Sequence, residues 1–443
     1  MTSLGLKPIG ILAGNGSLPG EIARAITAGG GSVQIVAINA DVDDDFSAFP
    51  IVHLGLGKIG AILKTFRDAG VQELIIVGGV SRPDLTKLRP DWGLFANLPE
   101  VVRLVFSGGD DGVLRIVVRF FEAKGFTVVS PADVVPSLAV GAGSLTAATP
   151  SPADVADILL GSSIVKALGA YDIGQAVIVR DGELLAIEAA EGTDRMLARV
   201  AASKNVIEGE KPRGVLVKRP KPGQEMRIDL PAIGPATVTR VAEAGLAGIA
   251  VLAGQSLAAQ RLQLIANARA ANVFVYGFTE GCDPTHQRSN IGHQRSNIGR
   301  IRVQTEVLGI IRPNASQLAD IRLGAAALAS LAALARGGAC VVSRGHILGL
   351  EPARDIGDLF QRTTRLQQWG IARLRRRASV AVLGDGVHVL AATIAAANGA
   401  NLSGVAIAAS QPVQAGVVHA ANASGLFLVR VIPSVLTSIE HSS

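Results

Sequence analysis

Short apolar runs alternate with amphipathic stretches over the first 135 residues. The runs IGILAG (9–14), VQIVAIN (33–39) and ELIIVGG (73–79) are rich in β-branched residues and end in glycine or asparagine, as buried parallel strands do. The stretches between them close on glycine, which is typical of a helix C-terminus. This alternation predicts an α/β domain over residues 1–135, with a doubly wound parallel sheet that binds ligands at the carboxyl ends of its strands.

A second domain is predicted over residues 153–278. The stretch before it, residues 136–152, is rich in proline and small residues and is typical of a linker. The domain opens with an apolar helical stretch and continues with two strand-like runs around an Asp-Gly turn at 181–182. Further strand-like runs and a helix from about Thr237 predict an α+β arrangement.

Residues 319–432 repeat the pattern of the second domain. The segment GACVVSRGHILGLEPA (338–353) matches QAVIVRDGELLAIEAA (175–190) at an offset of 163, and LSGVAIAASQ (402–411) matches LAGIAVLAGQ (246–255) at an offset of 156. Two matches in the same order predict an internal duplication. The intervening residues 279–318 contain a tandem copy of HQRSNIG, and its glycines and polar residues favour a loop over a histidine metal site.

The bulk composition is that of a globular protein with large cores. The 443 residues are 49% hydrophobic and 18% charged. The longest apolar stretch, 323–335, is too short to cross a membrane, and the N-terminus lacks the pattern of a signal peptide. Cys282 and Cys340 are too few for a disulfide framework. We therefore expect a cytoplasmic protein.

Positive charge is concentrated in the last third of the chain. The whole chain has a net charge of +6, and from residue 281 onward it carries 16 arginines, no lysine and 8 acidic residues. This asymmetry suggests an anionic partner surface. A compositional bias toward arginine would give the same counts, and the two explanations weigh about equally.

The turn after the first strand, Gly14–Asn15–Gly16–Ser17, resembles the start of a dinucleotide fingerprint. Such a turn presents backbone N–H groups to a phosphate, and Ser17 is placed to cap the following helix. Pro19 stands where the third glycine of the fingerprint would lie. An ordinary tight turn between a strand and a helix remains the alternative.

Acidic residues gather at two predicted helix starts. Asp110 and Asp111 follow a double glycine, where they would cap a helix or contact ribose hydroxyls or Mg²⁺. Glu188, Glu191 and Asp194 surround Thr193, which can cap the helix that begins there. Three neighbouring carboxylates need a metal or basic side chains nearby, unless they simply form a solvated helix start.

The segment LVKRPKPGQEMRIDLPAIGPATV (216–238) combines cations, one aspartate and rigid prolines. Lys218, Lys221 and Arg227 suit the charge of a diphosphate, and Asp229 suits Mg²⁺ or an attacking water. A solvated basic loop would not need three prolines.

Four motifs together resemble one known family. LAGNGSLP, GGDD, EAAEGTD and KPGQEMRIDLPAIGPAT resemble the UDP-2,3-diacylglucosamine pyrophosphatase family of the alpha-proteobacterial type, from lipid A biosynthesis, over residues 1–278. The resemblance implies a Rossmann-like first domain and Mg²⁺-dependent hydrolysis of the substrate to UMP and 2,3-diacylglucosamine 1-phosphate. It also implies that Asp229, in the RxDLP motif, is essential. Glu225 departs from the aspartate that is common before this motif.

The predicted site residues follow from these motifs and the resemblance. The catalytic candidates are Asp229, Lys218 and Lys221, and the metal candidates are Asp229, Glu191 and Asp194. The substrate-binding candidates are Gly14, Asn15, Gly16, Ser17, Gly79, Asp110, Asp111, Gln175, Thr193, Gln224 and Arg227. We expect this site between the first two domains, with Mg²⁺ as the cofactor.

The expected partners follow from the substrate class. The diacylated substrate implies peripheral contact with the cytoplasmic face of the inner membrane, and we expect no nucleic-acid partner. A homo-oligomer is left open. A nicotinamide-dependent oxidoreductase and a non-catalytic membrane-surface scaffold remain alternatives, but neither accounts for the motifs of the second domain.

The third segment lacks most of the predicted site. By alignment Glu188 is matched by Glu351, but Glu191 becomes Arg354 and Asp194 becomes Gly357. The same alignment pairs Asp229 with Asp385 and Gln224 with Val380. We therefore expect a degenerate, catalytically inactive copy that serves structure or contacts with lipid or a partner.

Overall fold

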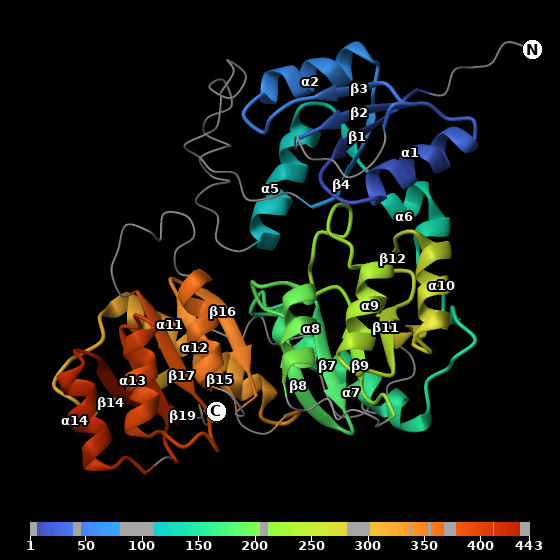
Figure 1. Ribbon diagram of the computed structural model, residues 1–443. Helices are drawn as coiled ribbons and strands as arrows, with labels where there is room; N and C mark the ends of the chain where they lie inside the picture. The colour runs from blue at the N-terminus through green and yellow to red at the C-terminus, as the bar shows by residue number, and fades with distance from the viewer. Residues whose placement is uncertain are drawn as a thin grey trace, which may run out of the picture. The chain divides into compact units, whose positions relative to one another are not determined.

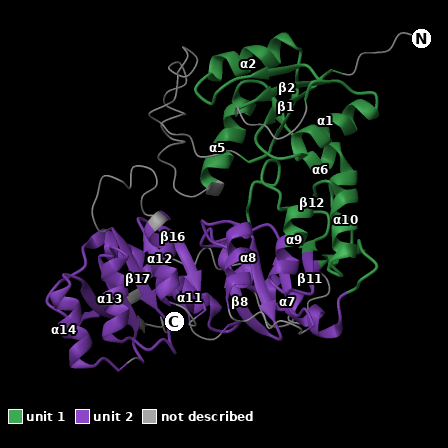
Figure 2. Ribbon diagram, viewed as in Figure 1, with its two compact units in different colours: residues 1–149, 223–239, 251–279 green, residues 150–222, 240–250, 280–443 purple. Residues whose placement is uncertain are grey.

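The computed structural model describes residues 7–38, 46–79, 110–203, 211–280, 302–335, 338–352, 356–366, 378–410 and 412–434. The chain forms two compact units (Figure 2). Unit 1 consists of residues 1–149, 223–239 and 251–279, and unit 2 of residues 150–222, 240–250 and 280–443. The HQRSNIG repeat and Cys282 lie outside the described residues.

The N-terminal part is a parallel sheet with helices (Figure 1). The strand order is β3-β2-β1-β4-β5, and all neighbours are parallel. Its strands are β1 (Ile9–Ala13), β2 (Val33–Ala37), β3 (Ile51–His53), β4 (Glu73–Val77) and β5 (Thr127–Val128), and its helices are α1 (Leu18–Ala28), α2 (Ile59–Asp68) and α5 (Asp110–Ala123). This order is that of a Rossmann-like half, which confirms the predicted α/β fold.

Both faces of this sheet are buried, which explains its nearly continuous apolar strands. Successive side chains of a strand point to opposite faces. Ile11 and Ala13 accordingly pack with the core beside α1, whereas Leu12 packs with Phe66 of α2 and Phe121 of α5 in the core on the other face. Two helix layers therefore enclose the sheet, and the carboxyl ends of its strands are left for loops.

The second domain contains a six-stranded sheet of order β6-β13-β11-β9-β7-β8. Its strands are β6 (Gly143–Ser144), β7 (Ala176–Arg180), β8 (Glu183–Ile187), β9 (Val215–Lys218), β11 (Gly248–Leu252) and β13 (Phe274–Phe278). Its helices are α7 (Pro152–Gly169), α8 (Thr193–Ala202), α9 (Pro235–Glu243) and α10 (Arg261–Ala270). Short elements complete this part of the chain: α6 (Pro131–Val134), the 3₁₀ turn η1 (Pro136–Leu138), and the parallel pair β10 (Ala232–Ile233) and β12 (Leu257–Ala258).

The third segment has the same topology as the second domain. Its sheet order, β14-β19-β18-β17-β15-β16, repeats the order of the second sheet strand for strand. The strands are β14 (Arg302–Val307), β15 (Ala339–Ser343), β16 (His346–Glu351), β17 (Ser379–Leu383), β18 (Gly404–Ala408) and β19 (Phe427–Ser434). The helices are α11 (Ala315–Leu331), α12 (Ile356–Leu366), α13 (Ala391–Gly399) and α14 (Ala415–Ala423).

Both expected linkers contribute elements to these sheets. Within residues 136–152, β6 pairs with β13 and the side chain of Val140 is fully buried. Within residues 279–318, β14 pairs with β19, and α11 begins at Ala315 behind a capping box that Asn314 forms with Gln317.

A buried aspartate stabilises the first hairpin turn in both copies. In the second domain the buried carboxylate of Asp157 accepts hydrogen bonds from the N–H groups of residues 181 and 182 (2.9 and 2.7 Å). In the third, Asp320 accepts them from residues 344 and 345 (2.8 and 2.6 Å). Both turn residues have positive φ in each copy, as a type I′ turn requires. Burial raises the pKa of both aspartates.

Strand register identifies the residue that replaces Lys218 in the third segment. Ala176 of β7 is the register partner of Lys218. Ala339 of β15, the equivalent of Ala176 at the offset of 163, is the partner of Leu383. A leucine therefore stands in the place of the lysine.

The same register corrects one predicted match. Val380 lies inside β17 at the place of Val215 in β9, so its match to Gln224 is wrong. The shortening of the third segment lies beyond this strand, because residues 219–234 between β9 and α9 correspond to the shorter loop 384–390 between β17 and α13. The loop that carries Lys221, Gln224 and Arg227 is thus the part that the third segment has lost.

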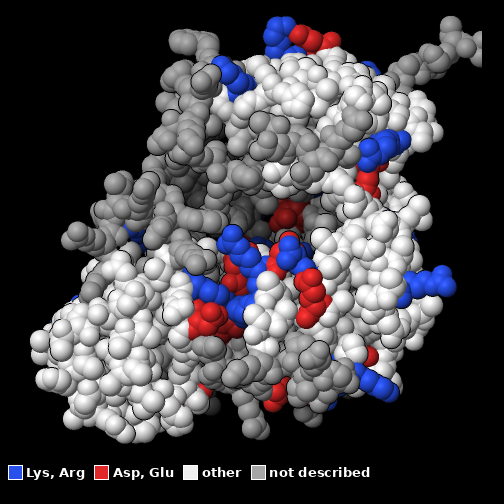
Figure 3. All heavy atoms as spheres, in the orientation of Figure 1, with Lys and Arg blue, Asp and Glu red and all other residues white. Residues whose placement is uncertain are grey.

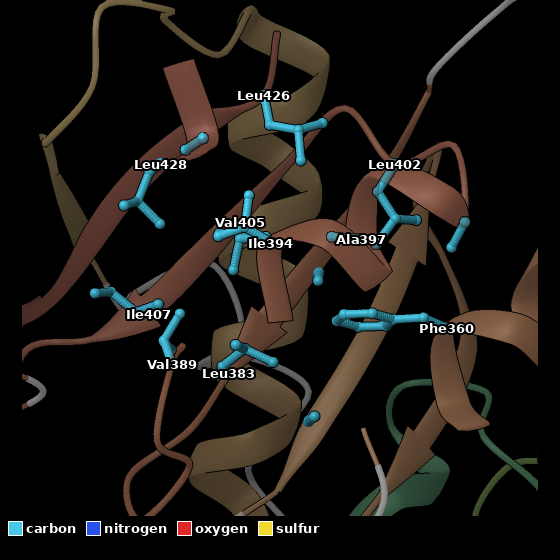
Figure 4. Close-up of a cluster of buried hydrophobic side chains, with 14 of the residues drawn as sticks. Phe360, Leu383, Val389, Ile394, Ala397, Leu402, Val405, Ile407, Leu426 and Leu428 are labelled. Carbon is cyan, nitrogen blue, oxygen red and sulfur yellow. The ribbon is translucent and has the colours of Figure 1, made fainter. Parts of the chain in front are cut away.

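The third segment has a large apolar core. Phe360 of α12 packs with Leu383, Ile394, Val405 and other aliphatic side chains from the sheet and its helices (Figure 4). Among the described residues, none of the helices has the length and hydrophobicity needed to span a membrane.

Candidate functional site

The predicted site residues belong to both units, and each group is described within its own unit. In unit 1 the glycine turn after β1 is closed against the end of β4. The N–H of Gly14 donates to the carbonyl oxygen of Val77 (2.8 Å), and Asn15 and Gly79 exchange two backbone hydrogen bonds (2.7 and 2.9 Å). A Cβ at Gly14 would lie 2.5 Å from the carbonyl oxygen of Gly79. Glycine is required here by this close approach, at the sheet edge where α/β proteins bind ligands.

The following residues lead into helix α1. Gly16 has a φ of +99° with open space around it. Ser17 precedes the helix, but its hydroxyl donates to Oε1 of Glu21 (2.7 Å) and accepts no helix N–H. The predicted capping role of Ser17 is therefore wrong. Glu21 in turn accepts a hydrogen bond from the N–H of Gln260 (2.8 Å), so this serine helps to hold the start of α10.

Asp229 lies in a turn whose side chains orient it. Its N–H donates to the carbonyl oxygen of Glu225 (3.0 Å). The amide Nε2 of the buried Gln224 donates to both the backbone oxygen and Oδ2 of Asp229, each at 2.6 Å. The structure thus brings Gln224 and Asp229 together and fixes the direction of the carboxylate.

Arg227 is held by two carboxylates on its own unit. Its guanidinium donates two hydrogen bonds to Glu225 (2.7 and 2.8 Å), and Nη1 donates to Glu122 of α5 (2.6 Å). The Arg227 guanidinium lowers the pKa of Glu225, and the carboxylates raise the pKa of Arg227. Sequence reasoning missed Glu122, because nothing in the chain signals a contact across more than a hundred residues.

In unit 2 a chain of hydrogen bonds positions Lys218. The carboxylate of Glu188 accepts from the N–H of Gln175 (3.0 Å) and from the hydroxyl of Thr193 (2.8 Å). Lys218 Nζ, at the end of β9, donates to Oγ1 of Thr193 (3.0 Å). Gln175, Thr193 and Lys218 are therefore brought together, and Glu188 is the residue that joins them.

Lys221 and Asp194 have partners elsewhere in unit 2. The buried Lys221 donates through Nζ to Asp172 (2.5 Å). Asp194, whose side chain is 61% exposed, lies 3.2 Å from Nε of Arg240. Their predicted roles toward substrate and metal stay predictions. Asp110 and Asp111 begin α5, and their side chains lie outside the described residues.

Glu191 belongs to a cluster of four charges, Glu191, Arg199, Glu351 and Arg362. Its Oε1 accepts from Arg199 (2.7 Å), and its Oε2 accepts from Arg362 of the third segment (2.6 Å). Oε1 of Glu351 lies 2.8 Å from a guanidinium nitrogen of each arginine. Acidic and basic side chains lie side by side over α8 and β16 in Figure 3. The sequence contained one signal for Arg362, because it is the equivalent of Arg199 at the repeat offset of 163.

The described part of the chain contains no group of three or more His, Cys, Asp or Glu side chains arranged to hold a metal ion. Both oxygens of Glu191 are engaged by arginines. Mg²⁺ typically takes only one or two protein carboxylates and completes its shell with water and substrate phosphates. The oriented carboxylate of Asp229 fits that kind of ligand, whereas Glu191 does not.

A Rossmann-like sheet with a glycine turn, joined to an α+β domain that holds a lysine at a strand end, defines the class as a multidomain α/β protein. Family models described as LpxI N-terminal domain and LpxI C-terminal domain match residues 8–138 and 141–276. UDP-2,3-diacylglucosamine pyrophosphatase LpxI of Caulobacter vibrioides is 39% identical over 274 residues, which are 61% of this chain and 98% of the relative. The chain belongs to the LpxI family.

This membership confirms the resemblance that the four motifs predicted and the expectation of an enzyme. Among solved structures, a murein peptide ligase Mpl from Psychrobacter arcticus 273-4 shows a TM-score of 0.19 and 10% identity, over 97% of this chain and 91% of that one. So low a score says nothing about this fold. The family matches end at residue 276, before the third segment.

Proposed function

We propose that this chain hydrolyses the pyrophosphate of UDP-2,3-diacylglucosamine in lipid A biosynthesis, giving UMP and 2,3-diacylglucosamine 1-phosphate. The 39% identical relative, named for this pyrophosphatase activity and matched over 98% of its length, supports the proposal. The observation that carries it is that the matched region holds a lysine and an aspartate in fixed positions, each by a hydrogen bond within its own unit: Lys218 to Thr193, and Asp229 to Gln224.

Each of these side chains has a role that its chemistry supports. Lys218 neutralises charge on the phosphate oxygens, and its bond to Thr193 reduces the freedom it would lose on binding substrate. Asp229 accepts a hydrogen bond from the attacking water and directs it toward a phosphorus atom. The turn at Gly14–Ser17 offers backbone N–H groups to the nucleotide part of the substrate.

Mg²⁺ is the cofactor we propose, with Asp229 as its protein ligand. When bound, the ion supplies positive charge to the diphosphate and lowers the pKa of a bound water. Arg227 remains bonded to Glu225 and Glu122, so it maintains the turn that presents Asp229. Asp194 is sufficiently exposed to contribute a second carboxylate.

The direct test is turnover by the purified full-length protein. We expect release of UMP from the diacylated substrate with Mg²⁺, and loss of release when EDTA is added and its restoration when Mg²⁺ is returned in excess. UDP-glucose, which lacks both acyl chains, is the control substrate. Absence of UMP at any Mg²⁺ concentration would contradict the proposed reaction, and undiminished release in EDTA would contradict the metal.

We also propose peripheral contact with an anionic membrane surface, because the substrate is a lipid and arginine is in excess after residue 281. Such contact depends on unscreened charge. Co-sedimentation with vesicles of anionic lipid is expected at 50 mM salt and is expected to fall steeply at 500 mM salt. Neutral vesicles are the control. Equal sedimentation at both salt concentrations would contradict an electrostatic contact.

A further inference from the structure

Helices α7 and α11, the first helices of the two copies, lie against each other in unit 2. Each also packs closely on its own sheet: a Cβ at Gly161 of α7 would lie 2.7 Å from Val217, and one at Gly324 of α11 would lie 2.7 Å from Val382. Both helices are apolar around most of their circumference, so the side away from the sheet needs a cover as well. Each helix supplies that cover for the other.

A polar contact fixes the ends of these helices. The hydroxyl of Tyr171, just beyond α7, lies 3.0 Å from the carbonyl oxygen of Ala326 and 2.7 Å from the hydroxyl of Ser330, both on α11. Strands β8 and β16, equivalent in the two copies, are also in contact. The same elements of each copy therefore face one another.

The four-charge cluster completes this contact between the copies. Two of its ion pairs cross from one copy to the other, Glu191 to Arg362 (2.6 Å) and Arg199 to Glu351 (2.8 Å). The glutamates are buried, with 7% and 8% of their side chains exposed. Burial raises the pKa of Glu351 to about 7, and the two guanidiniums oppose that rise. Removing the guanidinium supplied by the other copy would leave a buried carboxylate poorly compensated.

We propose that the face of the second domain made by α7, β8 and Arg199 binds a second copy of that domain. The third segment is this second copy, fused into the same chain. In this contact each element of the second domain lies against its own equivalent: α7 against α11, and β8 against β16. Arg199 and its equivalent Arg362 share the same two glutamates. Such a contact resembles a twofold interface, in which the same surface patch of two copies pairs with itself. The proposal is independent of the proposed hydrolysis.

The residues that the third copy keeps and loses agree with this role. It retains the apolar helix, Glu351 and Arg362, all of which contact the second domain, but it has a leucine in place of Lys218 and a shortened loop after β17. Fusion makes the pairing intramolecular, so it persists at any protein concentration. The contact also holds Glu191, which lies in the segment between Glu188 and Thr193.

The test reverses the two charges of the third copy together, as E351R/R362E. The pair between residues 351 and 362 survives, but each crossing pair now brings like charges together, and net charge is unchanged. The face of the second domain is then released, and Arg199 of another chain can take the place of Arg362 against Glu191. We expect multi-angle light scattering to report the mass of one chain for wild type and of two chains for this variant.

Reversing the partner charges as well, E191R/R199E in the same chain, restores every pair within the four-charge cluster and is expected to return the mass to that of one chain; the pair of Arg362 with Asp358 stays lost in both variants. The control is K64D/D68K, which reverses an exposed ion pair in unit 1 and is expected to leave the mass unchanged. A double variant with the wild-type mass would overturn the proposal. If the double variant fails to fold, the fourfold variant decides: recovery of the folded single chain supports the proposal, and failure to recover overturns it.

Discussion

Replacing Asp229 by alanine is expected to abolish UMP release, with a loss of about 10³-fold or more in kcat, while the substrate still binds. The variant removes the carboxylate that we assign to the attacking water and to Mg²⁺, and these roles together account for effects of that size. Binding is expected to persist because Lys218, which we assign to the phosphate oxygens, and the turn at Gly14–Ser17, which we assign to the nucleotide part, are unchanged. Turnover is measured by UMP release, and substrate affinity by isothermal titration calorimetry.

Asp385→Ala is the matched control for this experiment. Asp385 and Asp229 each lie six residues before a helix, α13 and α9 respectively. Asp385 is exposed and hydrogen-bonded to Ser410 in the third segment, so its loss is expected to leave UMP release unchanged. Full activity in Asp229→Ala would contradict the role that we assign to this carboxylate. Equal losses in the two variants would indicate a general effect on folding.

Replacing Lys218 by leucine is expected to lower kcat/KM by about 10²–10³-fold, the range for losing one donor that stabilises charge in the transition state. The fold itself should tolerate the change, because Leu383 occupies the same register position in the third copy. Far-ultraviolet circular dichroism and the urea unfolding midpoint are expected to match those of wild type. Activity and stability are thereby separated within one variant.

Two further variants define the role of Lys218. Thr193→Val removes the hydroxyl that links Lys218 to Glu188, and we expect a loss of about tenfold, since the charge remains and only its position is relaxed. Lys64→Met removes an exposed lysine of α2 and is expected to have no effect. A Lys218→Leu variant with wild-type kcat/KM would exclude this lysine from the reaction.

Much of the fold could be predicted from the sequence because the signals are local. The apolar runs that end in glycine or asparagine predicted strands β1, β2 and β4, and the Asp-Gly turn predicted the hairpin of β7 and β8. The duplication was readable from two matched stretches at fixed offsets. The family resemblance rested on four motifs within residues 1–278, and the matches to both LpxI domains confirm it.

Local patterns failed where a contact joins distant parts of the chain. The sequence suggested that Glu191 belongs with a metal or a basic partner, yet only the folded chain selects Arg362, 171 residues away. The match of Gln224 to Val380 went wrong because an alignment can place a shortening anywhere in a weakly matched stretch. Strand pairing allows one place for it, since a shift of one residue would turn every side chain of β17 to the opposite face.

By itself, the sequence determined the α/β class and the repeated domain and suggested the residue types of a phosphate site, because strand propensity, turn chemistry and charge are properties of short segments. Tertiary structure decided which partners the charged side chains meet: Lys218 meets Thr193, Asp229 meets Gln224, and the two arginines meet the two buried glutamates. The physical reason is that a buried charge is stable only beside its partner, and which residue becomes that partner depends on how sheets and helices pack.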